Sequence, residues 1–322
     1  MKGTSVQRGT QAASRRIPLL IAALAAFTPA LASTAPQAAA DENSCQAVQL
    51  TSVPAPVPVL DWSENLGYDR QGNLWVARIM RSEVQRFDRS GQLTAVVGVP
   101  FPGAVRLGPD GWMYVASGAV PTNLIPGTRN GAIVRFDPSV DHPAAQPFST
   151  GLGMPNGMGF DAAGNLYVAD SQLGVLKFGA DGVLDPAWTA AAPKNFDLAD
   201  GVNGMTLNGL TVAGEDVYVT VTASLTGRVL RVPIAAPDHA EVAADLLPQA
   251  ATALPDDLTA VGDTLYATTT AGQLVRIDTR THETCTMLTG QPLTAVAADP
   301  NAPGELVLAT ESGDLLRVRA EH

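Results

Sequence analysis

Leu166-Tyr167-Val168-Ala169 and, after a short turn, Val175-Leu176-Lys177-Phe178 decide the fold, because variants of this pair of segments recur six times along the chain. Both segments are β-branched, aromatic or alternately apolar and polar, which is typical of β-strands. The first strands of the six copies are Leu74–Ala77, Met113–Ala116, Leu166–Ala169, Val217–Thr220, Leu265–Thr268 and Leu306–Ala309. The second strands are Val84–Asp88, Ile133–Asp137, Val175–Phe178, Val229–Val232, Leu274–Asp278 and Leu315–Val318.

The copies recur with a period of roughly 40 to 50 residues, which matches a four-stranded propeller blade, and they show no sustained helical periodicity. Six copies therefore predict an all-β, six-bladed β-propeller around a central channel. Blade six has three clear strands, and Cys45–Leu50 is expected to supply its outer strand and close the ring non-covalently. Hairpin turns that end at Gly72, Gly111 and Gly164 are expected to hold these glycines at positive φ.

Residues 1–32 are predicted to be a signal peptide. Four basic residues precede an apolar run from Ile17 to Phe27, and Ala30-Leu31-Ala32 is typical of a cleavage site, with a second candidate at Ala38-Ala39-Ala40. A transmembrane anchor is the alternative, but the run is short for a membrane span. We expect an exported protein, periplasmic or extracellular, with a flexible segment at 33–44 and the propeller at 45–322.

Charge and cysteine content limit the function further. The net charge is −11, and loss of four basic residues with the leader makes it 16 − 31 = −15. Such an acidic chain is not expected to bind nucleic acid or an anionic membrane through its general surface. The two cysteines, Cys45 and Cys285, fall in the ring-closing strand and in the expected outer strand of blade five. A disulfide between them is predicted, with two buried thiols as the alternative.

One position varies between the copies in a chemically informative way. The position lies eleven residues before the aromatic residue of each first strand, or ten residues before it in blades four and five. It is occupied by Glu64, Gly103, Asn156, Asn208 and Asp256, and roughly by Thr294 in blade six. This position starts the innermost strand of each blade, at the mouth of the channel. Four oxygen-bearing side chains, Glu64, Asn156, Asn208 and Asp256, are therefore expected to converge there.

Asn-Gly and Asp at strand starts often satisfy local backbone groups through Asx-turns, which is one interpretation of this set. Gly103 shows, however, that the blade does not require a polar side chain here. Glu64 and Asp256 would also face each other across the channel, and two buried carboxylates without a partner are costly. A cation removes that cost, and an all-oxygen ligand set favours Ca²⁺, with Mg²⁺ or Mn²⁺ also compatible.

The segments around these residues resemble the metal-binding motifs of the gluconolactonase/regucalcin (senescence marker protein) family, and the related paraoxonases have a similar arrangement. The resemblance covers essentially the whole chain after the leader. It implies a six-bladed propeller with a divalent ion, usually calcium, in the channel, and hydrolysis of lactones or related esters. It also implies that Glu64, Asn156, Asn208 and Asp256 are ligands and that Asp256 is the general acid/base. The segments are Ser63-Glu64-Asn65-Leu66, Pro155-Asn156-Gly157-Met158, Asn208-Gly209-Leu210 and Pro255-Asp256-Asp257-Leu258.

The chain departs from the family at Asp257, where the family usually has glycine. Asp257 is therefore a candidate fifth ligand or the actual base, and both Asp256 and Asp257 are candidate catalytic residues. Asn203 is a rival for Asn208 at a less suitable spacing. The four histidines fall outside every motif, so no histidine dyad like that of paraoxonases is expected.

We thus predict an exported, metal-dependent hydrolase that acts on a small-molecule lactone or ester. One alternative is a non-catalytic ligand- or protein-binding propeller with a structural calcium. Another is a strictosidine-synthase-like enzyme, which relies on a glutamate base and no metal. Two long segments, Gly118–Arg129 and Pro186–Asn203, could wall or cover the channel, or could be surface loops.

Overall fold

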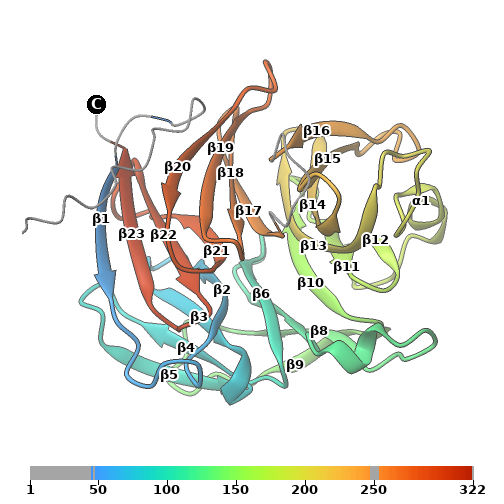
Figure 1. Ribbon diagram of the computed structural model, residues 1–322. Helices are drawn as coiled ribbons and strands as arrows, with labels where there is room; N and C mark the ends of the chain where they lie inside the picture. Colours follow the sequence, from blue (N-terminus) through green and yellow to red (C-terminus); the bar gives the residue numbers. More distant parts are fainter. Residues whose placement is uncertain (1–44, 46–47, 247–253, 321–322) are drawn as a thin grey trace, which may run out of the picture. The chain divides into compact units, whose positions relative to one another are not determined.

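Six antiparallel β-sheets arranged in a ring make up this computed structural model, which describes residue 45 and residues 48–246 and 254–320. The predicted signal peptide and the segment 33–44 lie outside the described residues. The innermost strands of the sheets contact one another in the order β2, β6, β10, β13, β17, β21 and back to β2 (Figure 1). The predicted six-bladed propeller is thereby confirmed.

Blade 1 consists of β2 (Ser63–Tyr68), β3 (Leu74–Arg78), β4 (Glu83–Phe87) and β5 (Leu93–Gly98). Blade 2 consists of β6 (Pro102–Leu107), β7 (Met113–Ser117), β8 (Gly131–Phe136) and β9 (Gln146–Leu152). Blade 4 consists of β13 (Gly204–Ala213), β14 (Asp216–Ser224), β15 (Arg228–Pro233) and β16 (Glu241–Asp245). Blade 5 consists of β17 (Pro255–Val261), β18 (Thr264–Thr269), β19 (Gln273–Asp278) and β20 (Thr284–Thr289).

Blade 3 departs from the predicted four strands. It has β10 (Pro155–Phe160), β11 (Leu166–Asp170) and β12 (Gly174–Phe178), followed by one isolated bridge from Phe178 to Leu184. The helix α1 (Pro186–Ala191) then takes the outer position, because Asp185 caps its first turn by accepting from the Trp188 N–H and Pro186 cannot donate to a strand partner. Trp188 packs into the apolar core shared with blade 4.

Blade 6 is completed by the N-terminal strand, as predicted. Its order is β21 (Leu293–Ala298), β22 (Glu305–Thr310), β23 (Leu315–Ala320) and β1 (Val48–Val53), with β1 antiparallel to β23. The predicted disulfide between Cys45 and Cys285 is also present, with the two Cα atoms 5.2 Å apart. It ties the chain before β1 to β20 of blade 5, so the seam of the ring is secured by both hydrogen bonds and a covalent bond.

Apolar side chains fill the spaces between blades, and the first strand of each repeat is its most buried element. The turn glycines Gly72, Gly111 and Gly164 have positive φ, as predicted. Two 3₁₀ helices, Ile79–Arg81 and Pro121–Leu124, lie in turns between strands. None of the helices in the described ranges is long and apolar enough to cross a membrane.

Candidate functional site

A β-bulge at the same place in all six inner strands forms the candidate site. Each inner strand carries one extra residue relative to its neighbour, and a bulge of this kind redirects a side chain out of the sheet pattern. The bulges lie between residues 63 and 65, 102 and 105, 155 and 158, 207 and 210, 255 and 258, and 293 and 295. The six positions registered from the repeat fall in these intervals, at one end of the channel.

The four oxygen-bearing side chains at these positions are brought together across blades. The Asn156 amide Nδ2 lies 3.4 Å from Glu64 Oε1, and Asn208 Nδ2 donates to Asp256 Oδ1 at 2.6 Å. The charge of Glu64 also raises the pKa of Asp256, so the two carboxyl groups lie close enough to interact electrostatically. Asn203 does not join this group, because its amide is bound to Thr226 and Ser224.

The partners of these side chains argue against the local Asx-turn interpretation. The bonds from Asn156 and Asn208 reach other blades and no nearby backbone group. Gly157 and Gly209, which follow these residues, are required for a different reason, because a side chain would collide with the neighbouring strand. A Cβ on Gly157 would lie 2.3 Å from the Asn208 carbonyl oxygen, and one on Gly209 would lie 2.4 Å from the Asp256 carbonyl oxygen. Adjacent inner strands therefore approach backbone to backbone.

The two remaining positions have different roles. A Cβ on Gly103 would lie 3.1 Å from Asn156 Oδ1, so glycine at this position leaves room for the amide. Thr294 is fully buried, and its hydroxyl donates to the Ser63 carbonyl of the neighbouring blade. Neither side chain adds a free oxygen to the channel group.

Both carboxyl groups of the site have raised pKa values. Burial raises the pKa of Glu64 to about 7, although the amide of Asn156 opposes the shift. Burial also holds the pKa of Asp256 well above its usual range, and the charges of Glu64 and Asp257 add to this effect. Two acids that both resist ionisation lack a compensating positive charge, because the ion pairs of the described residues include neither.

Asp257 has a different environment from its neighbour Asp256. Arg106 Nη2 donates to both carboxylate oxygens of Asp257, at 3.0 and 3.1 Å, and Asn65 Nδ2 donates to Oδ2 at 3.0 Å. Arg106 Nη1 also donates to Asn65 Oδ1 at 2.5 Å. Asp257 is thus neutralised by a bidentate, charge-assisted contact that spans blades 2 and 5.

Four residues near the site were not found from the sequence: Asn65, Arg106, Trp62 and Glu311. Arg106 could have been noticed as a cation within an otherwise apolar inner strand. Glu311, in the turn after β22, raises the pKa of both Glu64 and Asp256. The Trp62 indole N–H lowers the pKa of Glu64 but is buried without a hydrogen-bond partner among the described residues.

The donor set fits a hard divalent cation. It consists of two mutually repelling carboxylates and two amide groups, whose oxygens can serve as ligands. Within the described ranges no cluster of three or more His, Cys, Asp or Glu side chains has the geometry of a metal site. Any ion at this site would therefore depend on the amide oxygens of Asn156 and Asn208.

Exposed apolar side chains gather at the same end of the blades. They lie in two kinds of segment: those that lead into the inner strand of a blade, and those that connect its second strand to its third. Because neighbouring strands are antiparallel, both kinds lie at the end of the blade where the inner strand begins and has its bulge. The loop 118–129 is fixed there by Gln172, whose Nε2 donates to the carbonyl oxygens of Asn123 and Ile125. The residues of this apolar rim are Phe101, Ile125, Phe196, Leu198 and Leu225.

Comparison with known proteins defines the fold. No protein-family model and no curated protein matches the sequence. A gluconolactonase from Xanthomonas campestris is 15% identical over 85% of this chain and 90% of its own, with a TM-score of 0.64. A luciferin-regenerating enzyme is 13% identical over 84% and 95%, with a TM-score of 0.60. Virginiamycin B lyase from Staphylococcus aureus is 11% identical over 84% and 99%, with a TM-score of 0.57.

The resemblance to gluconolactonase-type propellers is thereby confirmed at the level of the fold. The same fold also occurs in a lyase, so the architecture alone does not specify a reaction. The function of this chain has to be argued from its channel residues.

Proposed function

We propose that this chain is an exported hydrolase that opens lactones or related esters with the help of a divalent cation, calcium best fitting the donors. One observation carries the proposal: the buried Asp256 and the partly buried Glu64 each contact an amide and act on one another electrostatically, without a basic partner in the described part of the chain. Gluconolactonase among the structural neighbours supports the reaction class. The disulfide between Cys45 and Cys285 supports export, since such bonds persist in oxidising compartments.

Glu64, Asn156, Asn208 and Asp256 would hold the cation through their side-chain oxygens. The amides of Asn156 and Asn208 would turn their oxygens inward, which exchanges the N–H contacts for oxygen ligation without moving the backbone. A bound divalent cation supplies Lewis-acid polarisation of the substrate carbonyl and stabilisation of the oxyanion.

We assign the general acid/base to Asp256 and not to Asp257. Asp256 lies in the channel group, and its side chain bonds to one neutral amide. Asp257 is held by Arg106 and Asn65, which engage both of its oxygens. These contacts leave Asp257 without a free oxygen toward a substrate, whereas Asp256 can take a proton from an attacking water.

The apolar rim suggests the substrate class. Phe196 and Leu198 are 62% and 76% exposed at the end of the blades that holds the site, and such side chains favour contact with an apolar ligand. We therefore expect a lactone or ester with an apolar substituent to react better than a polyhydroxylated sugar lactone.

Hydrolysis of a lactone panel with and without a chelator tests the proposal. Wild-type protein should hydrolyse activated or strained lactones, lose the activity in excess EDTA and regain it with calcium. Calcium-dependent thermal stabilisation without turnover would instead indicate a binding propeller with a structural ion. Turnover that is unaffected by complete metal removal would favour a metal-free mechanism of the strictosidine-synthase type.

A further inference from the structure

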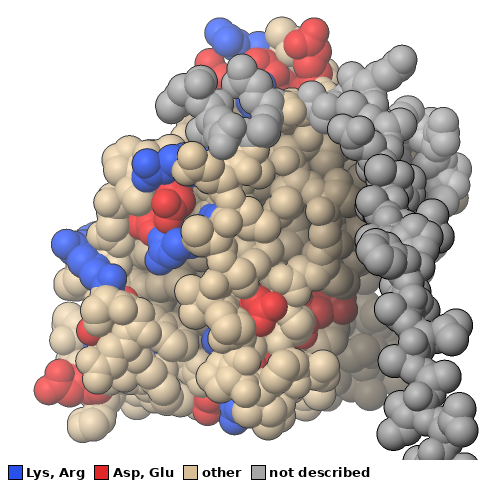
Figure 2. Space-filling view, turned by 60° about the vertical axis from the view of Figure 1, so that its left-hand side comes forward, with Lys and Arg blue, Asp and Glu red and all other residues tan. Residues whose placement is uncertain are grey.

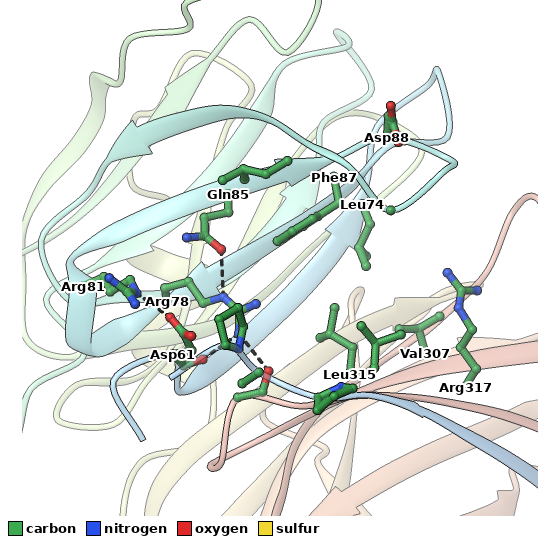
Figure 3. A pocket seen from close by; sticks show the side chains of 17 residues that line it. Asp61, Leu74, Arg78, Arg81, Gln85, Phe87, Asp88, Val307, Leu315 and Arg317 are labelled. Atoms are coloured by element: carbon green, nitrogen blue, oxygen red, sulfur yellow. Dashed lines mark hydrogen bonds and ion pairs between the residues drawn. The ribbon is translucent and has the colours of Figure 1, made fainter. Parts of the chain in front are cut away.

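A cavity of about 380 Å³ lies between blades 6 and 1, and none of the four candidate metal ligands lines it. Leu74 and Phe87 of blade 1 face Val307 and Leu315 of blade 6 across it (Figure 3). Residues 53–56, at the end of β1 and just after it, and Leu93 also line the cavity. Its volume is in the range of sites that take small organic molecules.

The cavity exists because the seam of the ring is sparsely packed. The apolar core between these two blades contains six buried residues, two of them alanines, Ala295 and Ala309. The core between blades 3 and 4, in contrast, includes Trp188 and Tyr167. The aromatic side chains between blades 6 and 1, Tyr68 and Phe87, are only partly buried, which leaves space open beside them.

Arg78 lies at one end of this cavity and is 3% exposed. Its Nε donates to Gln85 Oε1 at 3.0 Å, and its Nη1 donates to the carbonyl oxygens of Asp61 and Gly313 at 2.6 and 2.9 Å. All these acceptors are neutral, and Nη2 has no hydrogen-bond partner among the described residues. Burial lowers the pKa of the Arg78 guanidinium, as expected for a charge that is incompletely compensated.

The other charged side chains around the cavity are already engaged. The two oxygens of Asp61 accept from Arg81 Nε at 2.5 Å and from the Val57 N–H at 2.7 Å. Arg317, at the opposite end, is paired with Asp299 and Glu305. Asp88 also lines the cavity; it accepts hydrogen bonds from Ser90 and Gln92 and forms no ion pair within the described ranges. Within the described ranges no carboxylate forms an ion pair with Arg78, so this buried cation remains for a ligand.

We propose that this cavity binds a small molecule with an apolar body and one carboxylate group. The carboxylate would bind Arg78 through Nη2, and the body would lie between Phe87 and Leu315. Arg78 is suited to this role because guanidinium groups bind carboxylates with high geometric specificity. The charge complementarity is local, since the chain as a whole carries a net charge of −11 and repels anions.

The surroundings of the cavity are compatible with such a ligand. Figure 2 shows one face of the molecule, on which the charged side chains occur in small separate groups among uncharged residues. The Arg78 guanidinium carbon lies 5.9 Å from the centre of the Phe87 ring, so the charge and the apolar wall are adjacent. An apolar carboxylate can reach both at once.

Ligand-observed NMR and calorimetry with benzoate, hexanoate and octanoate, each compared with its primary amide, test the proposal. Excess EDTA is present throughout, and Asp256→Ala is measured in parallel, so that binding in the channel is separated from binding at the seam. We expect at least one carboxylate to bind at least tenfold more tightly than its amide, with no loss in Asp256→Ala.

Two variants locate the site. Arg78→Gln should weaken carboxylate binding at least tenfold and leave amide binding unchanged. Leu93→Trp should block the cavity, whereas Val96→Trp is the matched control, because Val96 is on the same strand, is also 46% exposed and does not line the cavity. If Arg78→Gln fails to fold, the comparison of the two tryptophan variants still decides. Absence of binding, equal affinity for amides, or equal loss in both tryptophan variants would overturn the proposal.

Discussion

The adjacent residues Asp256 and Asp257 should respond in opposite ways to the same substitution. Asp257→Asn removes the negative partner of Arg106 and leaves a partly buried guanidinium that is bonded to neutral groups. Breaking a buried ion pair by removing one partner costs about 3–5 kcal/mol of unfolding free energy. We expect a loss near the lower end, about 3 kcal/mol, because Arg106 keeps its bond to Asn65 and its bond to the Leu66 carbonyl.

Asp256→Asn should leave the stability of the metal-free protein unchanged or slightly raised. The substitution removes a buried charge that Glu64 and Asp257 both repel. If Asp256 is the general acid/base, kcat should fall by about 10²- to 10⁴-fold. Asp257→Asn should retain kcat to within about tenfold, since its partners place it outside the proton transfer.

The measurements are urea unfolding in EDTA and initial rates of lactone hydrolysis at saturating calcium, which compensates for weakened ion binding. A double variant of Arg106→Met and Asp257→Asn measures the coupling between the ion-pair partners and should recover part of the stability lost in the single variant. The reasoning is refuted if Asp257→Asn abolishes turnover while remaining stable, or if Asp256→Asn keeps the wild-type rate.

Three further predictions follow from the same contacts. Burial raises the pKa of Glu64 from 4.5 to about 7, so the metal-free protein should lose stability as pH rises through this interval. The increase in Tm on adding calcium should grow over the same interval. A calcium effect on Tm that is independent of pH would contradict this. The disulfide closes a loop of 240 residues, so its reduction should lower the unfolding free energy by on the order of 5 kcal/mol. Urea unfolding with and without reductant measures this change. An unchanged urea midpoint would show that β1 alone secures the seam. Gly103→Ala should raise the calcium Kd by about 10- to 100-fold by displacing Asn156, whereas Gly98→Ala, with open space around the added methyl, should leave the Kd unchanged in calorimetry.

The repeat predicted the fold and the common position of the four channel residues because each copy encodes the same local structure. Every inner strand has its bulge near its start, so counting residues, with one residue fewer for the shorter turns of blades 4 and 5, was sufficient to register Glu64 with Asp256. The outer strand of blade 3 was mispredicted, because the local preference of Asp185 and Pro186 for a helix start replaced it. Contacts between blades are not encoded locally, and the ion pair of Arg106 with Asp257 therefore could not be predicted.

That ion pair also explains why the channel tolerates an acid at Asp257. The residues that directly follow the bulge positions form a second layer of the channel: Asn65, Ala104, Gly157, Gly209, Asp257 and Ala295. Four of the six are small, and the other two, Asn65 and Asp257, bind each other and Arg106. The one negative charge of the second layer, at Asp257, is cancelled by Arg106. In the first layer no basic side chain of the described residues pairs with Glu64 or Asp256, and a divalent cation would balance them.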